Sequence, residues 1–225
     1  MLNNLSKESE PKKKKFMKRL LAWYSSNKRS YFFWRKTKNP YYILISEMML
    51  QKTTTNQVQK IVEKFIKRYS SPKKLAESPL QEIKELITPL GMEHKRTARF
   101  KESAKMIKEK FNGKIPDNET DLMALPGVGQ YIANSVLCLA YGKQVPLLDT
   151  NIVRILERVF ELKSAKSRAR TDQTIWNFVK EISPEKRARD TNLALLDFGA
   201  LVCTSKKPKC QICPMNDFCF FFNNR

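Results

Sequence analysis

Long apolar runs, acidic residues and histidine are all scarce in this sequence of 225 residues. No run approaches the ~18 consecutive apolar residues that a membrane-spanning helix requires, so we expect no membrane partner. The lysines near the amino terminus are not followed by the apolar stretch of a secretory signal peptide. The sequence therefore predicts a cytoplasmic protein.

Acidic residues are so few that 22 Asp and Glu stand against 43 Lys and Arg, which leaves a formal net charge of +21. Solubility requires far less, so the charge favours a polyanionic partner, and nucleic acid is the first candidate. A solvated basic surface without a partner is the alternative. Residues 1–15 end in four lysines and lack hydrophobic periodicity, and we predict that they form a flexible basic tail that adds affinity for phosphate.

Strand-like alternation is also rare. Apolar residues recur at spacings of three and four over most of the chain, and clusters of Pro, Gly and Ser separate these segments. The pattern predicts an all-α fold, with helices over residues 16–24, 42–50, 55–69, 80–86, 95–111, 130–141, 151–160, 174–182 and 189–202.

A glycine-rich turn, Leu125 to Gly129, lies between a short helical segment at 117–124 and the longer one that begins at Gln130. Gly127 and Gly129 allow a tight turn and a close approach to another chain, and amides at a helix start can bind phosphate. Such glycines also occur in purely structural turns. The helices on both sides favour a helix-hairpin-helix at about 117–141, which holds a DNA backbone without reading its sequence.

Asp149 closes an apolar run 20 residues beyond Gly129 and directly precedes a predicted helix. An isolated aspartate at such a place is most often the helix N-cap. Next to Leu147 and Leu148, and near the proposed phosphate site, its carboxylate could instead stabilise the cationic sugar that forms when a glycosidic bond breaks, or orient water.

Four cysteines, Cys203, Cys210, Cys213 and Cys219, are separated by six, two and five residues. Four thiolates in so short a segment indicate a metal centre in a reducing compartment, and either zinc or an iron–sulfur cluster could occupy it. The fifth cysteine, Cys138, lies in an apolar segment and is assigned to the core.

Taken together, the hairpin turn, Asp149 and the cysteine spacing resemble the helix-hairpin-helix, Gly-Pro-Asp (HhH-GPD) superfamily of base-excision DNA glycosylases, in its endonuclease III-like iron–sulfur branch. The resemblance spans roughly residues 23–220. It implies a 4Fe–4S cluster on the four cysteines, and a monomer that acts on double-stranded DNA containing a mismatched or damaged base. The implied fold has two lobes with a DNA cleft between them: a six-helix barrel at 31–142, and a cluster lobe at 16–30 plus 143–225.

Tyr131 occupies the position at which family members that also cut the DNA backbone carry a lysine, whose amine forms a Schiff base with the sugar. A phenol cannot form one. The resemblance therefore implies a monofunctional glycosylase without strong AP-lyase activity. Glu47 matches a glutamate of the base pocket that protonates or anchors the departing base. A solvated helix carboxylate is the alternative for Glu47.

The segment at 34–54 is similar to two monofunctional branches, one that removes thymine or uracil opposite guanine and one that removes adenine opposite 8-oxoguanine or guanine. Adenine-removing relatives usually carry paired glutamines where this chain has Gln51-Lys52, and a further domain after the cluster, whereas this sequence stops six residues after Cys219. We therefore expect thymine or uracil specificity, and adenine remains the alternative.

The resemblance also assigns residues that contact DNA. Gln51, with Lys52 beside it, fills the gap left by the extruded base, and Met92 after Gly91 forms a wedge in the opposite strand, with core packing as its alternative. The amides of Val128 and Gly129 clamp a phosphate, within the hairpin residues Gly127, Val128, Gly129 and Gln130. His94, the only histidine, is expected to contact backbone or solvent.

Two other classes of protein fit parts of the sequence. A non-catalytic DNA-binding iron–sulfur protein would keep the hairpin, the cluster and the charge. A four-cysteine zinc protein of RNA metabolism would be colourless, without the absorption near ~400 nm that thiolate-bound iron–sulfur clusters show.

Overall fold

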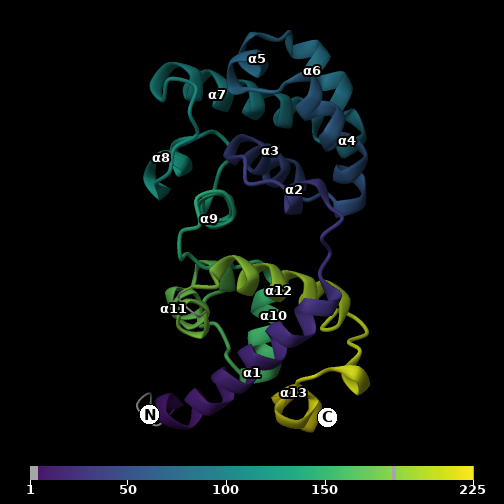
Figure 1. The fold of residues 1–225 in the computed structure, drawn as a ribbon, viewed down its shortest axis with the longest axis vertical. Coiled ribbons are helices and arrows are strands. Elements are labelled where there is room, and N and C mark those ends of the chain that lie inside the picture. Colours follow the sequence, from purple (N-terminus) through teal and green to yellow (C-terminus); the bar gives the residue numbers. More distant parts are fainter. Residues whose placement is uncertain (1–4, 184–185, 225) are drawn as a thin grey trace. The chain divides into compact units, whose positions relative to one another are not determined.

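The computed structural model describes residues 5–183 and 186–224, and the regular secondary structure in these ranges is entirely helical (Figure 1). The predicted all-α class is therefore confirmed. The chain divides into two compact units, unit 1 with residues 1–29 and 144–225, and unit 2 with residues 30–143. The sequence had placed these divisions at 30/31 and 142/143.

Unit 2 contains the six helices that the sequence predicted for it and two that it did not. Short helix α5 was missed because Pro72 was read as a break, whereas it is the first residue of the helix, after the N-cap Ser71. The other addition, α2, is a single turn. The helices are α2 (Phe33–Lys36), α3 (Pro40–Leu50), α4 (Thr55–Arg68), α5 (Pro72–Glu77), α6 (Leu80–Ile87), α7 (Glu93–Lys110), α8 (Glu119–Ala124) and α9 (Gln130–Leu139).

Helix α3 lies at the centre of unit 2. Asn39 caps its amino end, where its side chain accepts hydrogen bonds from the amides of Tyr41 at 2.9 Å and Tyr42 at 3.2 Å. Eight residues of α3 are buried, so this helix is enclosed rather than amphipathic. It packs against α4 and α9, and Cys138 on α9 is 1% exposed, as expected for a core residue.

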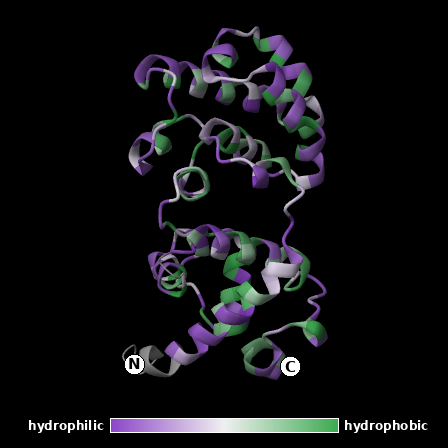
Figure 2. Cartoon of the chain, viewed as in Figure 1, coloured by the Kyte–Doolittle hydropathy of each residue, from purple (hydrophilic) through white to green (hydrophobic). Residues whose placement is uncertain are grey.

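Unit 1 is built around α10 (Thr150–Phe160), whose apolar residues Ile152, Ile155 and Leu156 are fully buried. The other helices of this unit are α1 (Leu5–Asn27), α11 (Gln173–Ile182), α12 (Ala188–Leu201) and the single turn α13 (Phe220–Asn223). Helix α12 packs against both α1 and α10. Figure 2 shows green, hydrophobic residues on one side of several helices and purple, hydrophilic residues on the other. No helix in the two described ranges is long and apolar enough to cross a membrane.

The predicted unstructured tail at residues 1–15 is wrong from Leu5 onward, because α1 already begins there. Two of its lysines bond residues from the second half of the chain. Lys13 lies over the ring of Phe178 at 4.9 Å and forms an ion pair with Glu181 at 2.8 Å, and Lys15 bonds Asp217 at 2.7 Å. Lysine stems cover apolar surface while their ammonium groups find acidic partners, an arrangement that local periodicity does not reveal. Residues 1–4 lie outside the described part.

Candidate functional site

The turn between α8 and α9 has the tight geometry that its two glycines predicted. Gly127 has a φ of 86°, in the left-handed region, and a Cβ there would lie 2.8 Å from Cδ of Arg99. Leu125 and Val128 are buried and anchor the turn. The backbone conformation therefore favours glycine at position 127, and a larger residue there would also have to displace the Arg99 side chain.

The amides of this turn differ in what they can bind. The Val128 N–H donates to the Leu125 carbonyl at 3.0 Å, so the predicted phosphate contact from the Val128 amide is wrong for this conformation. The physical reason is that the hydrogen bond from Val128 to Leu125 closes the turn and occupies the Val128 amide. Gly129 and Gln130 are exposed, and Gly129 is the N-cap of α9. The first amides of a helix have no partner within the helix, and they remain the candidates for a phosphate contact.

Glu47 and Tyr131 lie on two helices of unit 2 that pack together, α3 and α9. Glu47 is 6% exposed, so the alternative of a solvated helix carboxylate is wrong. Tyr131 is the second residue of α9 and is partly exposed. A buried carboxylate is costly unless it is hydrogen-bonded, so Glu47 is suited to hold a polar group.

The predicted DNA-contact residues Gln51, Lys52 and Met92 lie on two turns of unit 2. The Gln51 side chain donates from Nε2 to the Gly127 carbonyl at 2.8 Å, which links the end of α3 to the hairpin turn. Lys52 is exposed, and Met92 is 45% exposed. The alternative of core packing for Met92 is therefore wrong.

Asp149 is the N-cap of α10, which is the alternative that the sequence analysis gave for it. Its Oδ1 accepts the amide of Ile152 at 2.8 Å, and its Oδ2 accepts Nδ2 of Asn151 at 2.6 Å. The side chain is only partly buried. Each carboxylate oxygen has a further lone pair, so capping the helix fixes the orientation of the carboxylate without using up its capacity to bind.

Asn151 and Arg154, for which the sequence pattern predicted no role, extend this network toward the cysteines. Arg154 donates from Nη2 to Oδ1 of Asn151 at 2.8 Å and from Nε to the carbonyl of Cys203 at 2.9 Å. Gly199 on α12 lets Asn151 approach, because a Cβ there would lie 2.7 Å from Cβ of Asn151. The only sequence signal was the spacing of three between Asn151 and Arg154, which places both on one helix face.

The four cysteines Cys203, Cys210, Cys213 and Cys219 line one cavity in unit 1 and form no disulfide. The amide of Met215 points to Sγ of Cys213 at 3.4 Å, and Nη1 of Arg158 points to Sγ of Cys203 at 3.6 Å. Within the described ranges, no three Cys, His, Asp or Glu converge closely enough to hold a single metal ion. One zinc ion needs its four sulfurs at about 2.3 Å from a single point. Four cysteine thiolates around one cavity are a ligand set that iron–sulfur clusters take.

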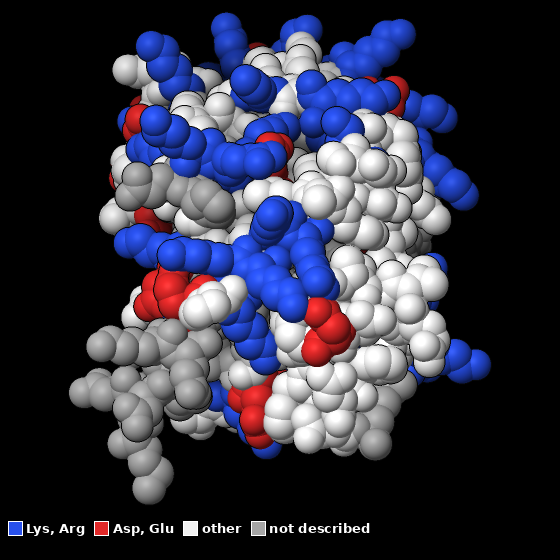
Figure 3. Space-filling view, turned by 60° about the horizontal axis from the view of Figure 1, so that its bottom comes forward, with Lys and Arg blue, Asp and Glu red and all other residues white. Residues whose placement is uncertain are grey.

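On the face drawn in Figure 3, blue Lys and Arg side chains cover more surface than red Asp and Glu side chains, next to a broad white area of uncharged residues. The basic excess of the sequence is thus displayed on the surface, where it can attract a polyanion. The His94 side chain is 78% exposed and lies 3.8 Å from a carboxylate oxygen of Glu93, as expected for a histidine in contact with solvent.

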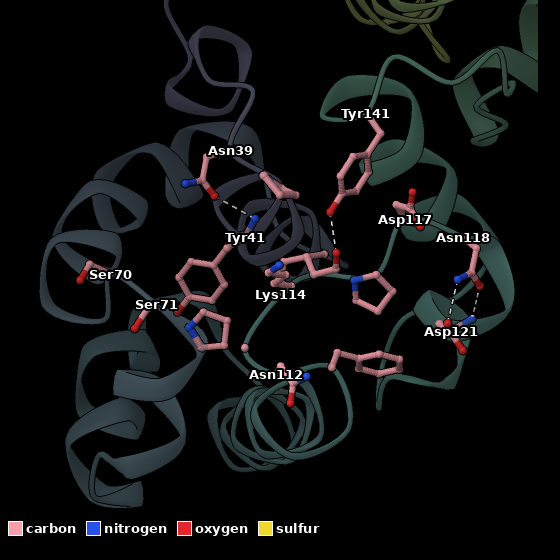
Figure 4. A pocket seen from close by; sticks show the side chains of 16 residues that line it. Asn39, Tyr41, Ser70, Ser71, Asn112, Lys114, Asp117, Asn118, Asp121 and Tyr141 are labelled. Atoms are coloured by element: carbon pink, nitrogen blue, oxygen red, sulfur yellow. Dashed lines mark hydrogen bonds between the residues drawn. The ribbon is translucent and has the colours of Figure 1, made fainter.

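A cavity of about 750 Å³ opens in unit 2 at the start of α3 (Figure 4). Tyr141 donates from Oη to the Ile115 carbonyl, and Tyr41 donates from Oη to the Tyr69 carbonyl at 2.8 Å. Burial raises the pKa of Tyr41 and of Tyr141, so both phenols stay protonated at neutral pH. None of the residues predicted for catalysis or DNA contact lines this cavity, so its size does not mark the predicted site.

The hairpin, the fixed carboxylate and the four-cysteine cavity point to one class, DNA repair proteins that carry an iron–sulfur cluster. The chain belongs to the HhH-GPD superfamily of base excision DNA repair proteins, whose family model matches residues 45–181, more than half of the sequence. A second family model, for the iron–sulfur binding domain of endonuclease III, matches residues 203–219. These matches confirm the predicted resemblance, the fold family and the 4Fe–4S cofactor, and the second match spans the four cysteines that we expect to hold it.

Individual relatives are similar over most of the chain. The thymine/uracil-DNA glycosylase of Pyrobaculum aerophilum is 45% identical over 181 residues, 79% of each chain. An adenine DNA glycosylase of Buchnera aphidicola is 34% identical over 80% of this chain but over only 51% of its own length. The solved structure of a thermostable thymine-DNA glycosylase superposes with a TM-score of 0.91 at 34% identity, covering 96% of this chain and 99% of the other.

Proposed function

We propose that this chain is a monofunctional DNA glycosylase that hydrolyses the N-glycosidic bond of thymine or uracil opposite guanine. The observation that carries the proposal is the 45% identity to a thymine/uracil-DNA glycosylase across 79% of both chains. The oriented, partly exposed carboxylate of Asp149 supports it. The protein would act as a monomer on DNA in the cytoplasm, at the nucleoid.

Binding would begin with attraction of the duplex to the basic surface. The exposed amides at Gly129 and Gln130 would take a backbone phosphate, since they lie at the start of α9. Gln51 and Met92 would occupy the space that the extruded base leaves and separate the neighbouring bases, with Lys52 on the adjacent phosphate. A mismatched base costs less to extrude than a paired one, which favours lesions over normal DNA.

The chemical step would use the carboxyl groups of Asp149 and Glu47 and a water molecule. As the N-glycosidic bond breaks, its electron pair leaves with the base and positive charge grows on the sugar, which the Asp149 carboxylate would stabilise. Water would then add to the sugar carbon and pass a proton to the Asp149 carboxylate, and the departing base would take up one proton, which leaves an abasic site and a neutral base. Glu47 and Tyr131 would hold the polar edge of the base, and Glu47 could supply a proton to it.

Tyr131 makes the proposed reaction stop at the abasic site. A phenol has no amine with which to form a Schiff base to the opened sugar, so no covalent intermediate would lead to strand cleavage. The iron–sulfur cluster, when bound to the four thiolates, supplies a covalent cross-link for residues 203–219. The residues that perform the reaction lie outside that segment.

Adenine removal is a second candidate because an adenine DNA glycosylase is 34% identical over 80% of this chain. Two observations rank it lower. The identity is smaller than that to the thymine/uracil enzyme, and Gln51 is followed by Lys52 instead of a second glutamine. A non-catalytic DNA-binding protein is the third outcome that an assay must distinguish.

The test is to incubate the protein with end-labelled duplexes that contain T·G, U·G, A·8-oxoguanine, A·G or an oxidised pyrimidine, with and without alkali. We expect scission of T·G and U·G duplexes only after alkali, because an abasic site is alkali-labile. Scission of the adenine duplexes alone would support the second candidate. Scission without alkali would contradict monofunctional action, and no scission in any duplex would contradict glycosylase function.

A further inference from the structure

Arg96, in the first turn of α7, is a buried cation directed at the carboxyl end of α3. Its side chain is 4% exposed, and Nη1 donates to the carbonyls of Met48 at 2.8 Å and Met49 at 3.0 Å. The last carbonyls of a helix have no partner within it and carry the negative end of the helix dipole. Arg96 satisfies these carbonyls from a different helix.

The same guanidinium also bonds two turns, the one that follows α3 and the one that precedes α7. Nη2 donates to the Gln51 carbonyl at 3.2 Å and to Oγ1 of Thr53 at 2.9 Å, and Nε donates to the Gly91 carbonyl at 3.3 Å. The Gln51 carbonyl belongs to the peptide that joins Gln51 to Lys52, and the Gly91 carbonyl belongs to the peptide that joins Gly91 to Met92. Arg96 therefore donates to the peptide directly before Lys52 and to the peptide directly before Met92.

Lys52 and Met92 are both in the left-handed backbone region, with φ of 55° and 53°. Residues other than glycine hold that conformation only where the surroundings enforce it. Thr53 adds a weaker tie, because its single hydroxyl hydrogen is shared between the Gln51 carbonyl at 3.2 Å and the Leu90 carbonyl at 3.4 Å. The two strained turns are thus fastened to each other through one guanidinium and one hydroxyl.

The environment of Arg96 is neutral dipoles. In the described part of the chain the guanidinium has no ion pair, and its hydrogen bonds go to carbonyl and hydroxyl oxygens. Burial, and then the nearby charge of Arg99, lower the pKa of Arg96, although an arginine remains protonated at neutral pH. Only a planar group with donors on three nitrogens can serve this set of acceptors at once, so lysine cannot replace it.

We propose that Arg96 is a positioning residue that fixes the Gln51–Lys52 turn and the Gly91–Met92 turn as one preformed unit, so that both enter the DNA duplex in a set spacing. The inference rests on the proposed function, in which these turns fill the space of the extruded base. Turns that moved independently would have to be ordered on DNA, at the expense of binding energy. With Arg96 in place, that ordering is already complete in the folded protein.

The experiment compares Arg96→Lys with the parental chain on two uracil substrates. One is a U·G duplex, in which the base must be extruded, and the other holds uracil in a bubble of unpaired bases, in which it is already unstacked. We expect the single-turnover rate of the variant to fall about tenfold on the duplex and less than about twofold on the bubble, since a small misplacement of a positioning element has effects of this order. Thr53→Val, which keeps Arg96 but removes the shared hydroxyl, should show a smaller loss in the same direction.

Ile107→Val is the matched control, because Ile107 is a buried residue of α7 that bonds neither turn. It should lower thermal stability and leave the ratio of duplex to bubble rates unchanged. An equal loss on both substrates in Arg96→Lys and in Thr53→Val would show a general effect on folding and overturn the proposal.

A readout that does not need catalysis separates this inference from the proposed function. In a duplex with 2-aminopurine next to a mismatch, the parental protein should raise the fluorescence by unstacking the probe, and Arg96→Lys should raise it less at saturating protein. If the parental chain cleaves no substrate, the proposed function fails while this comparison still tests Arg96. Equal fluorescence increases in both proteins would refute the role of Arg96.

Discussion

The amino end of α10 in unit 1 and the carboxyl end of α3 in unit 2 each hold a charged side chain, and they differ in exposure. Asp149 at α10 accepts hydrogen bonds from Ile152 and Asn151, yet it stays partly exposed. Arg96 at α3 is 4% exposed and bonds only its own unit. In both places a helix end stabilises a charge of the opposite sign. At these two helix ends, Asp149 keeps an exposed side that can meet a ligand, whereas the hydrogen bonds of the enclosed Arg96 position its neighbours.

The sharpest test of this comparison is Asp149→Asn, for which we expect the largest effect. Asparagine is also a good N-cap, so thermal stability should change little while the negative charge is lost. The single-turnover rate on a U·G duplex should fall by about a hundredfold or more, the size expected when one charge-stabilising group is removed. An unchanged rate would refute the assigned role of Asp149.

Arg154→Met should have the next largest effect, because it removes the donors that hold Asn151 and the Cys203 carbonyl. We expect the glycosylase rate to fall roughly tenfold as the Asp149 carboxylate loses its orientation. Absorption near ~400 nm measures how much cluster remains.

Arg158→Met provides the control for Arg154→Met. Arg158 contacts Sγ of Cys203 and the carbonyls of Thr204 and Ser205, with no recorded bond to Asn151. It should lower the cluster absorption while the rate per bound cluster stays near the parental value. The same loss per cluster in both variants would mean that the network through Asn151 has no separate effect on catalysis.

Gly127→Ala tests the hairpin of unit 2 and should have a moderate effect. The left-handed φ and the clash with Arg99 should reduce the free energy of unfolding by about 1–3 kcal/mol and weaken DNA binding. Gly129→Ala is matched to it, since a Cβ at Gly129 meets no atom within 4 Å. Thermal melts and DNA affinities at one salt concentration measure both. Equal stability losses would contradict the steric explanation.

Asp172→Asn should have the smallest effect on activity, because Asp172 caps α11 and bonds Ser164, Ala165 and Thr174. The Ser164 hydroxyl, and then the two backbone amides, lower the pKa of Asp172. A lowered pKa stabilises the fold above the unfolded-state value, and that contribution disappears as the pH falls through the folded-state value. Stability should therefore decline less steeply below about pH 4 in Asp172→Asn than in the parental chain. Identical slopes would show that this carboxylate is not coupled to folding.

The local sequence pattern was enough to identify candidate residues where the chemistry depends on neighbours in the sequence. The spacing of the cysteines, the glycine turn and the acid before α10 predicted the iron–sulfur site, the hairpin and Asp149. Three residues were missed: Asn151, Arg154 and Arg96. Their partners lie far away in the sequence, for example Cys203 for Arg154 and Met48 for Arg96, and a lone arginine in a helical pattern gives no sign that it will be buried.

Two errors have the same origin. The amino-terminal lysines were predicted to form a tail because periodicity is local, whereas their partners Phe178, Glu181 and Asp217 come from the other end of the chain. The Val128 amide was predicted to bind phosphate, but the closed turn uses it for Leu125. Which donors remain available depends on the final hydrogen-bond pattern, and residue types alone do not specify it.

The sequence by itself determined the helical segments, the basic charge and the four thiolates, because hydrophobic periodicity, net charge and ligand spacing are properties of the chain before it folds. The tertiary structure alone decided which charged groups are enclosed and which face solvent. Burial is set by neighbours brought together from distant segments, as when α7 carries Arg96 to the end of α3 and leaves Asp149 within reach of solvent.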